Sequence, residues 1–159
     1  MLNRRQMLCI VSAASLGASG AYAGAWSHES FENDSALDWV AEFQEQPTAA
    51  FLRSTLARGT TGKLIESFDG ESIIAAAEVV AASLGYAGKG FPQELAPIVA
   101  KSGVTFRALA PQAKAALNGV LGAKSELRES WSLHADGRTR WEGSVRGLLS
   151  RLSPSQAST

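Results

Sequence analysis

Residues 24–39, GAWSHESFENDSALDW, hold several of the side chains that could carry out chemistry. Within them, His28, Glu29 and Glu32 spell H-E-x-x-E. A zinc hydrolase motif of this kind needs a second histidine four residues after the first, so that two imidazoles share one helical face. That histidine is missing, and the three residues precede the first expected helix. The pattern therefore favours a solvated or locally hydrogen-bonded His28, and we expect neither a metal nor another cofactor.

Three carboxylates, those of Asp34, Asp38 and Glu42, follow at four-residue steps and share one face of the expected helix. Two carboxylates can act as acid and base in hydrolysis when they lie close together and one of them is desolvated. A row of this kind is more often a hydrated helix face. We expect the hydrated face, with Asp34 available as a helix cap and Asp38 as a partner for an arginine near the C-terminus.

Glu78 is the acidic residue with the most apolar surroundings, because it lies within AAAEVVAA. We expect its carboxylate to be at least half buried, and a buried carboxylate without a partner costs several kcal/mol. The candidate partners are an indole N–H of Trp26 or Trp39, an arginine of the last expected helix, and the amino group of Gly24 if the chain is cleaved before it. Structural pairing is the favoured role, with catalysis or ligand binding as the alternative.

Helices must position these side chains, because the apolar residues recur at three- and four-residue steps and no segment alternates as a strand does. We expect an all-α fold, a compact single-domain bundle of about six helices. The clearest helical patterns cover residues 35–46, 69–85 and 139–152. Weaker patterns follow Pro47, cover residues 93–101, and begin at Pro111 and at Ser125.

Short polar residues mark where these helices should begin. Asn33 or Asp34 should cap the first clear helix by accepting a hydrogen bond from a backbone N–H of its first turn. Asp69 should cap the central helix in the same way. Thr139 and Glu142 have the spacing of a capping box at the start of the last helix.

The first 23 residues have the features of a secretory signal peptide. Arg4 and Arg5 precede an uncharged stretch that ends in Ala21-Tyr22-Ala23, a small-residue cleavage pattern. We expect cleavage after Ala23, export to the periplasm or the medium, and no stable membrane anchoring afterwards. The adjacent arginines also resemble the twin-arginine export signal, so both export routes remain open. A domain over residues 24–152 and a disordered tail over 153–159 would follow.

The composition of the mature chain excludes several classes of protein. Cleavage would leave 136 of the 159 residues, and Cys9, the one cysteine, would be removed. Neither disulfides nor thiolate chemistry would then be available. Without Arg4 and Arg5, the mature chain has 13 basic and 15 acidic residues, a formal net charge of −2. This lacks the excess of basic residues that is typical of nucleic-acid-binding proteins. The acidic residues gather near the start and arginines near the end, so these two regions are expected to face each other.

Several motifs together resemble the domain of unknown function 4259 family. They are Gly24-Ala25-Trp26, the segment FEND with ALDW over residues 31–39, and AAAEVVAA in the central helix. The resemblance extends over nearly the whole mature chain, and members usually begin with the Gly-Ala-Trp segment. It implies an all-α fold class and no activity, because the family has no assigned function.

The sequence therefore predicts an exported all-α domain in which Trp26 and Phe31 dock into the helical core and lead the chain to its first cap. A non-catalytic binding or interaction module, with a protein as one candidate partner, is the favoured function. A small hydrolase using Glu78 or Asp38 is the first alternative. A cytoplasmic immunity-type or regulatory module is the second, if the leader is retained.

Overall fold

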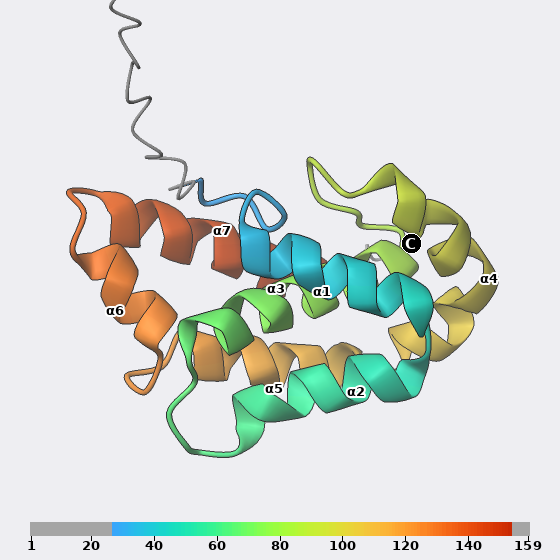
Figure 1. Ribbon diagram of the computed structural model, residues 1–159, viewed down its shortest axis with the longest axis horizontal. Helices are drawn as coiled ribbons and strands as arrows, with labels where there is room; N and C mark the ends of the chain where they lie inside the picture. The colour runs from blue at the N-terminus through green and yellow to red at the C-terminus, as the bar shows by residue number, and fades with distance from the viewer. Residues whose placement is uncertain (1–26, 154–159) are drawn as a thin grey trace, which may run out of the picture.

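The computed structural model describes residues 27–153, and this part of the chain is an all-α bundle (Figure 1). The predicted fold class is confirmed, although the described residues form seven α-helices where about six were expected. The predicted signal peptide, Trp26 and residues 154–159 of the predicted tail lie outside the described range. The elements are α1 (Asp34–Glu45), α2 (Ala49–Ala57), the 3-10 turn η1 (Arg58–Thr60), α3 (Ser67–Ser83), the 3-10 turn η2 (Gln93–Leu95), α4 (Ala96–Arg107), α5 (Ala110–Val120), α6 (Glu126–Ser132) and α7 (Gly137–Arg151).

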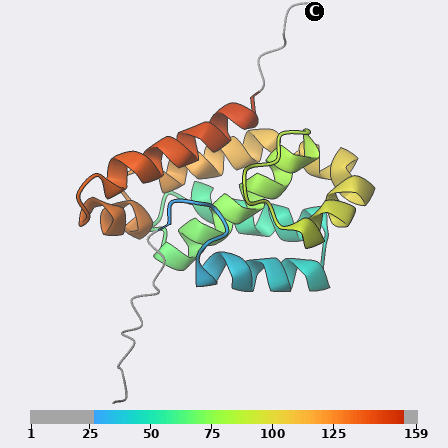
Figure 2. The ribbon, with the colours of Figure 1, turned by 90° about the horizontal axis from the view of Figure 1, so that it is seen from above.

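Helix α3 is the centre of the bundle. It contacts every other α-helix, and Figure 2 shows α1 along one side of it and α7 along the opposite side. Its middle is rich in alanine, which has no long side chain to hold neighbouring helices apart. Ala75, Ala76, Ala77 and Ala81 are completely buried. The central helix is therefore the packing surface on which the other helices are placed.

Helix α1 is amphipathic, as its sequence pattern predicted. Trp39 and Phe43 lie in the core and stack on each other, with ring centroids 5.1 Å apart and planes 8° from parallel. The indole N–H of Trp39 donates to the hydroxyl of Thr55 in α2 over 3.1 Å. A buried indole thus has its hydrogen bond, and α1 is fixed to both α2 and α3.

Asn33 is the cap of α1. Its side-chain oxygen accepts a hydrogen bond from the backbone N–H of Ala36 over 2.7 Å, and its own backbone is extended. Asp34 is the first residue of the helix instead of its cap, and its negative charge suits the positive end of the helix dipole.

The predicted cap of the central helix is wrong. Helix α3 begins at Ser67, so Asp69 lies inside the first turn, where its carboxylate accepts a hydrogen bond from Arg58 over 2.8 Å. Just before this start, an isolated bridge between Ile65 and Ser125 ties the preceding loop to the start of α6.

The predicted capping box of the last helix is also wrong. Helix α7 begins at Gly137, after Asp136 in a left-handed conformation with φ 57°, so Thr139 already lies within the helix. Glu142 accepts hydrogen bonds from Arg138 over 2.8 Å and from Arg128 over 3.3 Å. These two arginines occupy the carboxylate of Glu142, which a capping box would need as the acceptor for a backbone N–H.

No helix within residues 27–153 is long and apolar enough to cross a membrane.

Candidate functional site

Two carboxylates on α3, those of Glu71 and Glu78, lie on the side of the helix that faces α7 and the opening segment. We define the opening segment as residues 27–33, which precede α1 and are drawn in blue in Figure 1. The two glutamates are seven residues apart, so they share a face of the helix about 10 Å apart along its axis.

Glu78 is buried and fully paired. Its side chain is 4 % exposed, and Arg151 of α7 donates to both carboxylate oxygens, over 2.7 Å from Nη1 and 2.6 Å from Nη2. The hydroxyl of Ser30 in the opening segment adds a third donor over 2.9 Å. Of the partners that the sequence offered, the structure therefore places an arginine of the last helix on Glu78. Trp39 donates elsewhere, and Trp26 and Gly24 lie outside the described residues.

The loop between α3 and η2 closes over this ion pair. Arg151 also donates to the backbone carbonyl of Tyr86 over 3.0 Å. A side chain on Gly88 would place its Cβ 2.8 Å from Oε2 of Glu78 and 3.0 Å from Nη1 of Arg151, so the ion pair or the loop would have to shift to make room for it. The hydrogen bond from Arg151 to Glu78 is the main cause of a raised pKa at Arg151, and the charge of Glu29 adds to it. Glu78 is buried and its charge is balanced by Arg151, whose side chain stays partly exposed, and this arrangement suits a structural role.

Glu71 has a different environment. Burial raises the pKa of its carboxyl group, a hydrogen bond from the side chain of Ser35 lowers it, and the nearby charge of Asp34 raises it again. The groups that act on this half-buried carboxylate are thus a hydroxyl and another acid, and neither is a cation.

Glu71 lines a small cavity of about 30 Å³ between the opening segment and helices α3, α6 and α7. We call this cavity the Glu71 hollow. Its size is that of one or two water molecules. Its walls are Ser27, His28, Glu29, Ser30 and Asn33 of the opening segment, Glu71 and Ile74 of α3, Leu127 and Trp131 of α6, and Trp141, Ser144 and Val145 of α7.

The sequence reading did not select Glu71, because it lies in the first turn of α3, where an acidic side chain is normally solvated. One signal could have found it. Glu71 precedes Glu78 by seven residues, so both lie on the same face of the helix, and that face was expected to be buried at Glu78.

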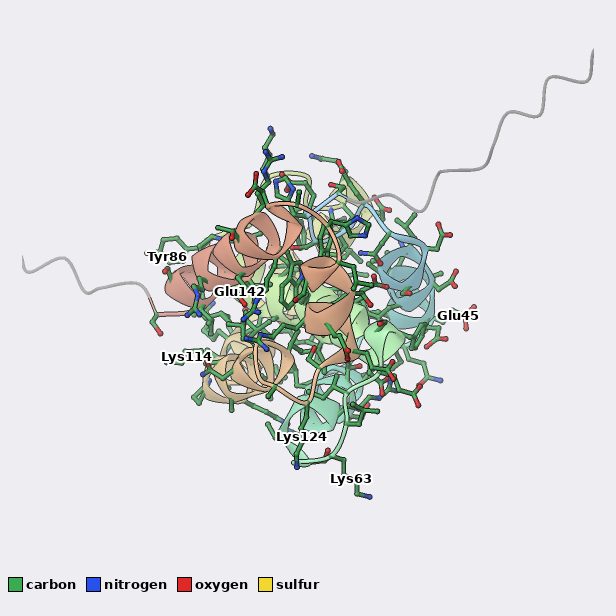
Figure 3. The ribbon with its side chains drawn as sticks, turned by 90° about the vertical axis from the view of Figure 1, so that its left-hand side faces the viewer. Glu45, Lys63, Tyr86, Lys114, Lys124 and Glu142 are labelled. Carbon is green, nitrogen blue, oxygen red and sulfur yellow. The ribbon has the colours of Figure 1, made fainter. Side chains whose placement is uncertain are left out.

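The acidic face of α1 does not take part in either site. Asp34, Asp38 and Glu42 are exposed, which agrees with the hydrated face favoured from the sequence. Asp38 makes no ion pair with any residue of the described range, so its predicted pairing with a C-terminal arginine is wrong. Helices α1 and α7 lie on opposite sides of α3, and Figure 3 shows Glu45 at the end of α1 far from Glu142 of α7.

Phe31 brings the opening segment onto the bundle. It is partly buried against the core, and its ring meets that of Phe91 edge to face, with centroids 5.8 Å apart. Together with the bond from Ser30 to Glu78, this contact places the opening segment across α3 and next to α7. The opening segment thus meets the last helix at the pair of Glu78 and Arg151. The acidic residues of α1, however, form no ion pair with the arginines of α7, so the expected facing of the acidic start and the basic end is wrong for α1.

The H-E-x-x-E residues do not gather into a metal site within the described chain. His28 and Glu29 lie in the opening segment and line the Glu71 hollow, whereas Glu32 lines a separate surface depression near Lys89. Residues 27–153 contain no group of three or more histidines, cysteines, aspartates or glutamates that could hold a metal ion.

Comparison with known proteins identifies one family. The family model described as a domain of unknown function, DUF4259, matches residues 24–144. Glu71 and Glu78 lie within the matched range, and Arg151 lies beyond it. No curated protein and no solved structure matches the chain.

Proposed function

The chain belongs to the DUF4259 family, and from this premise we propose that it is an exported, non-catalytic module that binds a positively charged group of a partner. The proposed binding site is the Glu71 hollow.

The observation that carries the proposal is the half-buried carboxylate of Glu71, which lines the hollow and forms no ion pair with any residue of the range 27–153. Taking a carboxylate partly out of water disfavours its charged form, which is why its pKa is raised. A cation bound in the hollow would stabilise the charged form, and the same interaction free energy would appear as affinity for that cation.

The geometry favours binding over hydrolysis by the residues that the sequence suggested. Glu78 is held by Arg151 and Ser30 and covered by the loop at Gly88, so a substrate would have to displace a buried ion pair. Asp38 is exposed on the far side of α3. A carboxylate pair for glycoside hydrolysis needs both groups on one reacting bond, and these two do not converge.

Export is supported by two features of the sequence. The first 23 residues have the composition of a signal peptide, and the family match begins at residue 24, the residue that would follow cleavage. Mass spectrometry of the amino terminus checks this part of the proposal. An exported chain beginning at Gly24 supports it, and a chain that keeps residues 1–23 and stays in the cytoplasm contradicts it.

Binding is tested with three small probes that carry different cations. They are N-acetyl-lysine methylamide, the same compound with a trimethylated ammonium, and N-acetyl-arginine methylamide. Calorimetric titration of the purified chain should show binding of at least one probe and its loss in Glu71→Gln. Asp38→Asn is the matched control, because it removes one exposed carboxylate and should leave binding unchanged. Absence of binding by all three probes, or equal loss in both variants, would contradict the proposal.

A further inference from the structure

The size and the lining of the Glu71 hollow indicate which cation it fits. We infer that the bound group is a primary ammonium, supplied either by a lysine side chain of a partner or by the chain's own amino group at Gly24 after cleavage. This inference rests on the proposed function, because it names the chemical class of the ligand at the same site.

The volume of the Glu71 hollow distinguishes a primary ammonium from a guanidinium and from a quaternary ammonium. The cavity of about 30 Å³ has room for a group of the size of one or two water molecules. A primary ammonium is a compact point charge at the end of a flexible stem. A guanidinium is a plane of four heavy atoms, and a quaternary ammonium carries three methyl groups, so both need more space than the cavity offers.

The hydrogen-bond acceptors that line the hollow also favour a primary ammonium. A primary ammonium has three N–H donors and no acceptor, so a site for it must present several acceptors. The carboxylates of Glu71 and Glu29 and the hydroxyl of Ser144 line the hollow. Ser35 uses only part of the acceptor capacity of Glu71, since a carboxylate has about four lone-pair directions.

The remaining wall suits the methylene stem that carries an ammonium. Ile74 of α3 and the indole of Trp141 in α7 line the same cavity, and both side chains are largely buried. Lysine stems commonly pack along apolar surface while the charged end reaches a polar group. A cavity of this size has room for the ammonium and the methylene group next to it, so these two groups match the polar and the apolar parts of the lining, and the rest of the stem would lie outside.

Both sources of a primary ammonium can reach the site. Gly24 is three residues before Ser27, which lines the hollow, and three residues span at most about 10 Å. A free α-amino group has a pKa of about 8 and is mostly protonated at neutral pH. The chain terminus and a partner lysine therefore present the same chemistry, and an experiment has to separate them.

The test compares two forms of the chain that begin at Gly24, one with a free amino group and one with that group acetylated. In the acetylated form, the lysine probe should bind at least about tenfold more tightly than the trimethyl and arginine probes, because only the compact ammonium keeps its charged hydrogen bonds in the cavity. Glu71→Gln should abolish this preference, and Asp38→Asn should preserve it.

The chain with a free amino group shows whether the ammonium comes from the chain terminus or from a partner lysine. If the chain terminus occupies the hollow, the α-amino group followed by NMR should have a raised pKa that returns to its ordinary value in Glu71→Gln, and the lysine probe should bind more weakly than to the acetylated form. If a partner lysine is the ligand, both forms should bind the lysine probe equally. Either result supports a primary ammonium, but occupancy by the chain terminus would mean that the hollow does not serve a partner, and the proposed function would then be wrong while the inference holds.

Two results would overturn the inference, and they have different consequences. Tighter binding of the trimethyl or arginine probe that still depends on Glu71 would reject the ammonium and keep the proposed function. If no probe binds and the α-amino group titrates identically in the parent chain and Glu71→Gln, both the inference and the proposed function are wrong.

Discussion

Glu71 and Glu78 lie two turns apart on one face of α3, yet within the described part of the chain only Glu78 of the two is paired with a cation. Glu78 is 3 % exposed and is held by Arg151 on both oxygens. Glu71 is half buried and shares its surroundings with a hydroxyl and an aspartate. The comparison shows that depth of burial alone does not indicate function. What separates a structural carboxylate from a candidate binding group is whether the protein supplies its counter-charge.

Helix α7 explains why the two glutamates differ. Arg151, which binds Glu78, and Ser144, which lines the Glu71 hollow, are also seven residues apart. The two helices therefore present equivalent positions at the two sites, with an arginine at one and a serine at the other. A single residue type on α7 leaves one site charge-balanced and the other acidic.

The largest expected effect comes from removing the built-in cation. Arg151→Ala leaves a buried carboxylate unpaired, which we expect to lower the free energy of unfolding by about 3 kcal/mol. Urea denaturation at neutral pH measures the change. The double variant Glu78→Met with Arg151→Met should recover most of this loss, because an apolar pair of similar volume carries no uncompensated charge. A loss below about 1 kcal/mol in Arg151→Ala would show that Glu78 does not depend on its arginine.

A smaller loss is expected from crowding the same pair without removing a charge. In Gly88→Ala the new Cβ would lie 2.8 Å from Oε2 of Glu78, so the loop or the ion pair has to move. We expect a loss of about 1–3 kcal/mol in the free energy of unfolding, as for other over-packed sites.

Gly143→Ala in α7 is the matched control for this substitution, because its Cβ would meet no atom within 4 Å. It should stabilise the chain by about 0.5–1 kcal/mol, the helix propensity difference between the two residues. Equal effects at the two glycines would mean that the loop at Gly88 does not close tightly over Glu78.

The sequence predicted those parts of the fold that depend on local pattern. The apolar spacing of α1, its Asn33 cap and the buried central helix all follow from residues close together in the chain. The pattern over residues 93–101 predicted a helix there, but α4 continues to Arg107. Gly103, which reads as a helix end, is instead buried near Ser83, so packing carries the helix past it.

The candidate site was harder to predict because it is made by segments distant in sequence. The surroundings of Glu78 within AAAEVVAA predicted its burial, and the arginines of the last helix were among its expected partners. The environment of Glu71 depends on where the opening segment and α7 cross α3. No sequence pattern near Glu71 predicts where these segments cross. The predicted cap at Asp69 failed for a related reason, since a hydrogen bond from Arg58 holds that side chain.

The smallest expected effect on stability comes from giving Glu71 the cation that Glu78 already has. In Ser144→Lys, an ammonium on α7 can enter the Glu71 hollow, whereas Ser144→Met adds a stem of similar shape without charge. In the parent chain, burial raises the folded-state pKa of Glu71 above the ordinary value of a glutamate. Its contribution to stability is therefore present below that value and is lost as the pH rises through the raised pKa.

Ser144→Lys should lower the pKa of Glu71, because the charged carboxylate gains a partner. The loss of stability that accompanies ionisation of Glu71 in the parent chain should then disappear. At neutral pH we expect Ser144→Lys to exceed Ser144→Met in the free energy of unfolding by up to about 1 kcal/mol, with the difference vanishing in acid as Glu71 becomes protonated. The lysine variant should also lose binding of every cationic probe. Equal stability of the two variants at all pH values, with probe binding intact, would mean that Ser144 and Arg151 do not occupy equivalent positions. The contrast between the two glutamates would then need another cause.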